Sequence, residues 1–266
     1  MTAPVLAATV DAFLGGRVAA IQPVGGHHRS GLDAVLLAAA VEAGFSGTIV
    51  DLGAGTGVAG FAVAARCPGA RVVLVERDPD VAECAVAALA RPENQAFAAR
   101  VRVIVADIRE VAASDDRLRP ASADAVIMNP PFHDAGAGTA PPLAPRRAAY
   151  VLEDDGLDAW FRAALTVLKA HGALALIYRA DRLDDVLAAC RRRIGGIAVL
   201  PVAPRGNGAA TRIIVCGTKG SRAPLRLLPA LTLHGPAGNA FLPGPNAVLR
   251  DGAALSEVSA AWMGVG

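Results

Sequence analysis

The sequence predicts an α/β fold with a doubly wound, mostly parallel sheet of about seven strands. Short segments that are apolar throughout alternate with amphipathic stretches, which is typical of strands buried on both faces by helices. One apolar segment ends in a glycine-rich turn that leads into a helical pattern, as in a βαβ unit. Of the 266 residues, 53% are hydrophobic and 19% are charged, so the chain can bury a substantial core.

The hydrophobic pattern predicts the elements in order. Ser30 and Asp33 resemble a capping box that opens a helix reaching Val41. Strands are then expected at 48–51, 71–76, 101–106, 123–128, 173–178, 197–202 and 211–216, and helices ending near 67 and spanning 79–90, 157–169 and 182–194. The segment 91–100 is expected to be a loop. No helical pattern separates the last two strands, so we expect them to pair antiparallel at the sheet edge, followed by an irregular tail with a short hairpin at most.

The composition argues against several classes of protein. No run of about 18 apolar residues occurs and the N-terminus has no basic region, so neither a membrane span nor a signal peptide is expected, and we expect a soluble cytoplasmic protein. The cysteines are widely spaced and read as small core residues: Cys67, Cys84, Cys190 and Cys216. The histidines lack ligand spacing, so no metal is expected.

The charge distribution is uneven along the chain. Residues 145–226 carry 14 basic and 7 acidic side chains, although the whole chain has a formal net charge of only +2. Such a block is suited to an anionic partner, although a solvated arginine-rich surface would look the same in the sequence.

Seven residues form a compact motif at the first turn of the βαβ unit: Asp51, Leu52, Gly53, Ala54, Gly55, Thr56 and Gly57. Alternate glycines between a strand and a helix let the backbone approach a ligand closely, and the helix that follows offers free N–H groups. The motif therefore indicates a nucleotide-like cofactor. The glycines alone do not identify it, because Gly55, Gly57 and Gly60 also satisfy the dinucleotide-binding pattern.

Acidic residues at strand ends favour S-adenosylmethionine over a dinucleotide. Asp51 is poorly placed beside a pyrophosphate but well placed for a cationic amine such as the methionyl amine. Glu76, at the end of the next strand, can accept hydrogen bonds from ribose hydroxyls. Asp107, after the third strand, is suited to the exocyclic amine of the cofactor adenine. Their neighbours Arg77 and Ile108 are further candidates for cofactor contacts.

The motif Asn129-Pro130-Pro131-Phe132 follows the fourth expected strand. An exocyclic amine on a planar ring is a poor nucleophile because its lone pair is delocalised. If the Asn129 side-chain oxygen and the Pro130 carbonyl each accept one N–H, the nitrogen can become pyramidal and direct its lone pair at a methyl group. The prolines restrict the backbone, and Phe132 offers a face on which a base can stack. The motif therefore favours methylation of a planar amine.

In this order, the two motifs and the acids resemble those of class I S-adenosylmethionine-dependent methyltransferases, which have a Rossmann-like fold. Residues 20–220 carry this resemblance, and within the class the chain is similar to the bacterial tRNA adenine-N6 methyltransferase family, whose type member modifies position 37 of valine tRNA. The segment 28–37, the pair Arg146 and Arg147, and the segment 219–225 support the narrower resemblance. It implies tRNA as partner and transfer of a methyl group to the N6 amine of adenine, by direct displacement.

The resemblance also implies a division of the chain. Residues 1–46 would be a segment covering the cofactor, with Asp33 near its methionyl end. Residues 47–219 would be the methyltransferase core, and 220–266 a C-terminal extension packed on it. Phe132, His133, Arg146 and Arg147 are the candidate substrate contacts. A monomer or a homodimer is expected.

Several alternatives remain open from the sequence. Phe132 followed by His133 and Asp134 also resembles ribosomal RNA guanine-N2 methyltransferases, although these generally carry a large N-terminal partner domain. Glutamine-N5 methyltransferases share the Asn-Pro-Pro motif, and DNA adenine methyltransferases usually have an inserted recognition domain. An NAD-dependent oxidoreductase and a non-enzymatic RNA-binding protein are the alternatives from other classes.

Overall fold

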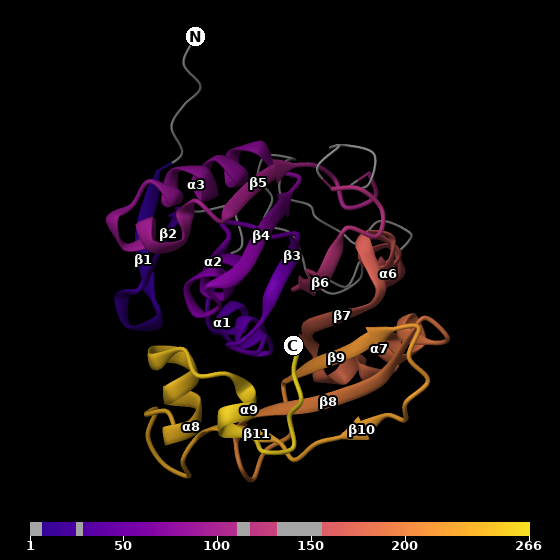
Figure 1. Cartoon of the computed structure of the whole chain (residues 1–266). Coiled ribbons are helices and arrows are strands. Elements are labelled where there is room, and N and C mark those ends of the chain that lie inside the picture. The colour runs from indigo at the N-terminus through magenta and orange to yellow at the C-terminus, as the bar shows by residue number, and fades with distance from the viewer. Residues whose placement is uncertain (1–6, 25–28, 111–117, 132–155) are drawn as a thin grey trace, which may run out of the picture.

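The computed structural model describes residues 7–24, 29–110, 118–131 and 156–266. A twisted central sheet runs through the molecule, and helices lie on both of its faces (Figure 1). The strands of this sheet are β3 Ser46–Leu52, β4 Gly69–Glu76, β5 Val101–Val105, β6 Ala123–Met128, β7 Leu168–Arg179, β8 Ile194–Arg205, β9 Arg212–Lys219, β10 Arg226–Leu227 and β11 Leu231–His234.

The strand order is β10-β8-β9-β7-β6-β3-β4-β5, and β11 pairs with β8. Along the run β7-β6-β3-β4-β5 of this order, each strand is parallel to the next. β9 is antiparallel to both β7 and β8, which confirms the antiparallel pair expected at the end of the sheet. Seven strands form the predicted doubly wound sheet, and the two short strands β10 and β11 extend it beyond the prediction.

Helices cover the two faces of the sheet. The larger ones are α1 Leu32–Ala39, α2 Val58–Arg66, α3 Pro79–Leu89, α6 Gly156–Val167 and α7 Leu183–Cys190. Residues of α1, α2 and α3 share one hydrophobic core, and residues of α6 and α7 share the other. Successive strand residues alternate between the cores: in β3, Ile49 belongs to the first and Val50 to the second, as the pleat requires.

Local sequence explains why some elements begin where they do. The Asp78 carboxylate caps α3 by accepting hydrogen bonds from the backbone N–H groups of Asp80 and Val81, and Pro79 occupies the first turn. The four cysteines are free and buried, which confirms that they are core residues.

The capping box predicted at the start of α1 is wrong. The N-cap of α1 is Gly31, with no side-chain cap hydrogen bond. The backbone N–H of Ser30 donates instead to the side chain of Gln22, and the Asp33 carboxylate pairs with Arg212. Partners from distant parts of the chain therefore replace the local capping interaction.

A two-stranded hairpin at the start of the chain was not predicted. β1 Ala8–Phe13 pairs antiparallel with β2 Val18–Pro23. Its short polar and alanine-rich strands give little periodic signal, and packing of β2 against α3 stabilises the hairpin.

Two regions expected to be irregular contain regular structure. The segment 91–100, expected to be a loop, holds the 3-10 turn Pro92–Asn94 and the helix α4 Gln95–Ala98. The tail holds β10, β11, α8 Pro243–Asn246, the π-helical turn Ala247–Asp251 and α9 Leu255–Val258. These elements are too short to give a periodic pattern. Pairing with β8 and packing on the core that α1, α2 and α3 share stabilise them.

Other boundaries also shift. The helix expected to reach Lys169 ends at Val167, because β7 begins at Leu168 opposite Ala123 of β6. The helix expected at 182–194 ends at Cys190. Pairing between β6 and β7 therefore sets the C-terminal end of α6.

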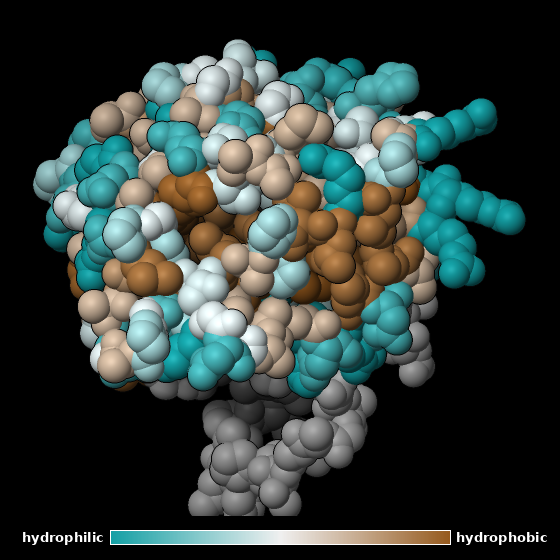
Figure 2. Space-filling model, turned by 90° about the horizontal axis from the view of Figure 1, so that it is seen from below, coloured by the Kyte–Doolittle hydropathy of each residue, from teal (hydrophilic) through white to brown (hydrophobic). Residues whose placement is uncertain are grey.

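In Figure 1, the helices α8 and α9 of the C-terminal segment 220–266 lie at the lower left, below α1. Figure 2 views the molecule from below and shows apolar residues gathered in a patch among hydrophilic ones. Leu225, Leu227 and Met263 are among the exposed large hydrophobic side chains of this segment, at 47%, 68% and 66% exposure.

Candidate active site

The candidate site lies at the carboxyl end of the parallel strands. β3 and β6 are neighbours in the sheet, although β4 and β5 come between them in the chain. From this pair the strand order runs in opposite directions, and such a reversal opens a crevice beyond the strand ends. The glycine-rich motif follows β3 and the Asn-Pro-Pro motif follows β6. The fold thus brings together the two motifs singled out in the sequence.

The glycine-rich turn requires glycine for two different reasons. Gly53, Gly55 and Gly57 have φ values of 65°, 57° and 87°, in the left-handed region that glycine favours. A Cβ on Gly53 would also lie 2.3 Å from the Trp160 ring, whereas one on Gly55 would meet, in the described part of the chain, only the Ser30 hydroxyl oxygen, at 3.9 Å. The turn therefore presents an open side at Gly55, where a ligand can approach the backbone.

The remaining members of the motif are inside the protein. The side chains of Leu52 and Ala54 belong to the two hydrophobic cores, so any contact with a ligand would come from their backbone. The Thr56 side chain is 2% exposed, and its hydroxyl has no hydrogen-bond partner among the described residues. An unsatisfied buried hydroxyl is costly, and a ligand in the turn could satisfy it.

Asp51 is almost completely buried, with 2% of its surface exposed. Its Oδ2 atom accepts a hydrogen bond of 2.9 Å from the backbone N–H of Gly60 in the first turn of α2. One of the helix N–H groups expected to be free is therefore occupied by a carboxylate. Burial raises the pKa of Asp51 from 3.8 to about 7, with a further increase from the negative charge of Glu76. A carboxylate here disfavours a phosphate and favours a cation.

Glu76 is held beside the glycine-rich turn. Its Oε2 atom accepts a hydrogen bond of 2.8 Å from the N–H of Gly55, and its Oε1 atom accepts one of 2.9 Å from the N–H of Asp78. Each carboxylate oxygen has a second lone pair, so Glu76 can still accept hydrogen bonds from a ligand hydroxyl. The two backbone contacts fix its orientation.

Asp107 lies at the end of β5 and is already engaged by arginine. Its two carboxylate oxygens accept hydrogen bonds of 2.9 Å from the Arg109 guanidinium, and the Arg77 Nη1 atom lies 3.9 Å from Oδ2. The hydrogen bond from Arg109 lowers the pKa of Asp107. Ile108 is half-buried against the core below α6 and α7. Asp107 is thus ionised, and an adenine amine that donates to its carboxylate would do so beside the Arg109 guanidinium.

Asn129 and Pro130 lie where β6 ends. The Asn129 Oδ1 atom is buried and has no hydrogen-bond partner in the described part of the chain. Pro130 is buried and Pro131 is half-buried. A buried amide oxygen without a donor is suited to accept an N–H group from a bound ligand.

Asp33 lies at the start of α1 and forms an ion pair of 2.9 Å with Arg212 at the start of β9. This pair joins the start of α1 to β9. The candidate substrate contacts Phe132, His133, Arg146 and Arg147 lie outside the described residues.

Three features of the site were missed in the sequence. Trp160 packs against Gly53, Arg109 engages Asp107, and Ser30 faces Gly55. Arg109 is close to Asp107 in the sequence and could have been considered as its partner. Trp160 and Ser30 reach the turn only through tertiary packing, so no local pattern points to them.

The described residues hold no group of three or more His, Cys, Asp or Glu side chains that could bind a metal ion. In the same parts of the chain, no helix is long and apolar enough to cross a membrane.

The sheet order, the glycine-rich turn and the acids at or just after the ends of β3, β4 and β5 give the chain the fold of the class I S-adenosylmethionine-dependent methyltransferases. The residues fit this cofactor: among the described residues the turn is open at Gly55, a buried carboxylate faces the helix start, and the Thr56 hydroxyl has no partner. The chain belongs to the methyltransferase small domain family, whose model matches residues 24–187.

Known proteins agree with this assignment. A tRNA1(Val) (adenine(37)-N6)-methyltransferase of Porphyromonas gingivalis is 34% identical over 163 residues, which cover 59% of this chain and 61% of the relative. A crystal structure of a predicted O-methyltransferase from Agrobacterium tumefaciens is 36% identical, with a TM-score of 0.68, covering 81% of this chain and 94% of that one. A 16S rRNA N2 methyltransferase of T. thermophilus shares the fold, at 18% identity and a TM-score of 0.54, covering 85% and 47%.

Proposed function

We propose that this protein methylates the exocyclic N6 amine of adenine in tRNA, at position 37. The observation that carries the proposal is the buried Asn129 Oδ1 atom, which has no donor among the described residues and lies just after β6, next to the strand that leads into the glycine-rich turn. The relative named for tRNA adenine-N6 methylation supports the choice of base and RNA. Because the alignment covers 61% of that relative, the whole activity is inferred.

The chain's own residues would align the amine. Asn129 Oδ1 and the Pro130 carbonyl would each accept one N–H of the target amine, which removes the nitrogen lone pair from conjugation. When bound, S-adenosylmethionine supplies a methyl group on a cationic sulfur. Asp51, Glu76 and the backbone around Gly55 would hold this cofactor. Alignment of the two reactants is the main catalytic contribution, and the proton of the amine is lost after transfer, so no general base is required.

The substrate side rests on the sequence. Phe132 would stack on the flipped base, and His133, Arg146 and Arg147 would contact the RNA around it. In this proposal residues 1–46 cover the cofactor, 47–219 form the catalytic core, and 220–266 complete it.

The experiment is methyl transfer to RNA in vitro with isotopically labelled cofactor. Total tRNA and ribosomal RNA from a strain deleted for the gene are the substrates, and digested nucleosides are identified by mass spectrometry. We expect labelled N6-methyladenosine in tRNA with the wild type and none with Asn129→Ala. Labelled N2-methylguanosine would show that the base is guanine, a 2′-O-methyl nucleoside would show O-methylation, and each would overturn the proposal.

A further inference from the structure

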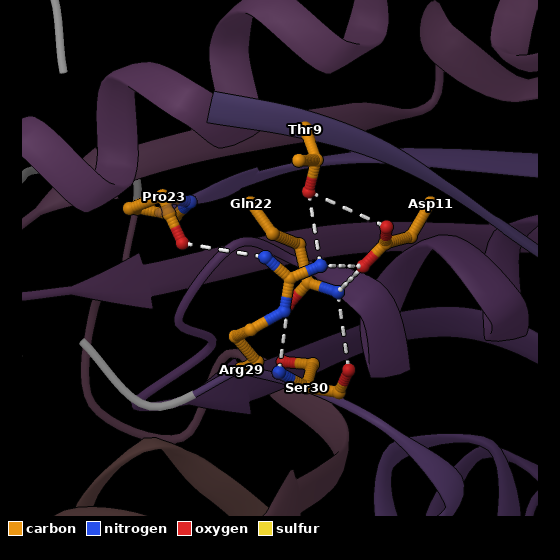
Figure 3. A network of polar contacts seen from close by, with 6 residues as sticks. All are labelled: Thr9, Asp11, Gln22, Pro23, Arg29 and Ser30. Carbon is orange, nitrogen blue, oxygen red and sulfur yellow. Dashed lines mark hydrogen bonds and ion pairs between the residues drawn. The ribbon is translucent and has the colours of Figure 1, made fainter. Parts of the chain in front are cut away.

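A network of polar contacts ties the β1–β2 hairpin to the residues before α1 (Figure 3). The Arg29 Nη2 atom contacts Asp11 Oδ2 at 2.5 Å and donates to Thr9 Oγ1 at 2.9 Å. Gln22 also donates to Asp11 Oδ2, at 2.6 Å. The Asp11 Oδ2 atom therefore accepts from two donors, one from its own hairpin and one from the segment beyond it.

Gln22 is the central residue of this network. Its side chain is 1% exposed, although glutamine is seldom fully buried. Its Oε1 atom accepts a hydrogen bond of 2.7 Å from the backbone N–H of Ser30, and its Nε2 atom donates to the Ser30 carbonyl at 3.1 Å. Both backbone groups of Ser30 are thus bound by one side chain, which fixes the position of this residue against β2.

The hairpin that carries Gln22 is itself anchored to the fold. The buried side chain of Asn94 accepts from the N–H of Ala19 at 3.0 Å and donates to the carbonyls of Ala19 and Ala88 at 2.7 and 2.8 Å. β2 is therefore joined to the end of α3, which packs on the sheet. Such an anchored strand can hold Ser30 in a defined place.

Ser30 borders the cofactor turn. Its hydroxyl oxygen is the only atom within 4 Å of the place where a Cβ on Gly55 would lie, among the atoms of the described residues. α1 begins two residues later, at Leu32, without a side-chain cap at Gly31. Among the described residues, no side-chain cap at the start of α1 takes the place of the contacts from Gln22 to the Ser30 backbone.

We propose that Gln22 is a positioning residue that sets the affinity for S-adenosylmethionine by holding Ser30 at the open side of the Gly55 turn. This inference rests on the proposed cofactor site. Without the two contacts to its backbone, Ser30 would become ordered only when the cofactor binds. The conformational entropy lost in that ordering would make the binding free energy less favourable. The affinity would then fall, whereas the rate at saturating cofactor would not.

The test measures binding of S-adenosylhomocysteine by calorimetry, below the unfolding temperature of every variant. Gln22→Met keeps the length and volume of the side chain but loses the paired hydrogen bonds. We expect its Kd to rise about ten-fold with kcat at saturating cofactor within two-fold of wild type. Ser30→Ala should also raise Kd, and the double variant should bind no more weakly than the weaker single variant, because Gln22 acts through Ser30.

Asn94→Ala is the matched control, since it weakens the same hairpin at its other end without touching Ser30. We expect a lower Tm and a Kd within about two-fold of wild type. Equal weakening of binding by Asn94→Ala and Gln22→Met would indicate general loosening of the hairpin and overturn the inference. An unchanged Kd in Gln22→Met, or additive effects in the double variant, would also overturn it.

Two further arms keep the test decisive. If Gln22→Met does not fold, Asp11→Asn replaces it, because this carboxylate is partly exposed and holds the Gln22 amide. A smaller rise in Kd supports the inference, and no rise overturns it. Failure of the wild type to bind S-adenosylhomocysteine would instead refute the proposed cofactor site, so the two failures are distinguishable.

Discussion

Cofactor affinity should depend on pH because of Asp51. Burial raises the pKa of this carboxyl group to about 7, so in the protein without cofactor it is largely protonated below neutral pH. A methionyl amine beside it carries a positive charge and favours the carboxylate. Binding should therefore release a proton from Asp51 wherever the free protein holds one.

The size of the effect follows from the pKa. Below about pH 7, affinity should fall about ten-fold for each pH unit, so that Kd at pH 6 is about ten-fold above its value near pH 8. Asp51→Asn keeps an acceptor for the Gly60 N–H but removes the titration, so its profile should lack the acidic limb.

The same shift changes stability, with a definite sign. The pKa of Asp51 is higher in the folded protein than in the unfolded chain, so folding is favoured by protonation. The stability from this group is present below about pH 4 and is lost as the pH rises towards 7. The difference between 3.8 and about 7 corresponds to at most about 4 kcal/mol. Without ligand, Asp51→Asn should thus melt at a higher temperature than wild type at pH 8.

The assay is calorimetric titration with S-adenosylhomocysteine from pH 5.5 to 8.5. Repeating each titration in two buffers with different ionisation enthalpies gives the number of protons released. We expect close to one proton at pH 6 for wild type and none from this site for Asp51→Asn. A wild-type Kd that is constant between pH 5.5 and 7, with no proton release, would refute the reasoning.

Three further predictions concern single residues. Asn129→Ala should lower kcat at least 100-fold while the cofactor Kd stays within about three-fold, because the lost atom aligns the amine; single-turnover kinetics showing a wild-type rate would contradict this. Gly60→Ala should lower the free energy of unfolding by about 1–3 kcal/mol, since the new Cβ would lie 2.2 Å from a Leu74 methyl carbon; an unchanged Tm would argue against it. Arg66→Met should lower the free energy of unfolding by about 3 kcal/mol and Tm by roughly 6–12 °C, because the buried guanidinium donates to three backbone carbonyls. A decrease in Tm below 2 °C by calorimetry would contradict that role.

Much of the candidate site could be predicted from the sequence because its residues follow strands. Asp51, Glu76 and Asn129 each end a segment whose apolar run is long enough to read, and parallel strands in one sheet present their carboxyl ends at one edge. The turn glycines could be predicted too, since only glycine readily adopts the positive φ that the turn has.

Features that depend on distant partners could not be predicted in this way. Ser30 and Asp33 have the spacing of a capping box, yet Gln22 and Arg212 bind them. Both patterns are compatible with the same local sequence, and only the position of the hairpin and of β9 decides between them. Likewise, nothing near Gly53 indicates that the Trp160 ring packs on it.

The sequence by itself determined the order of the main strands and helices, the glycine-rich turn after β3 and the place of the Asn-Pro-Pro motif after β6, because hydrophobic period, glycine and proline act within a few residues. The tertiary structure alone decided the hairpin, the short strands added to β8, and the network that holds Ser30 at the turn. Those elements are too short to be stable alone, so their conformation is set by the surfaces on which they pack.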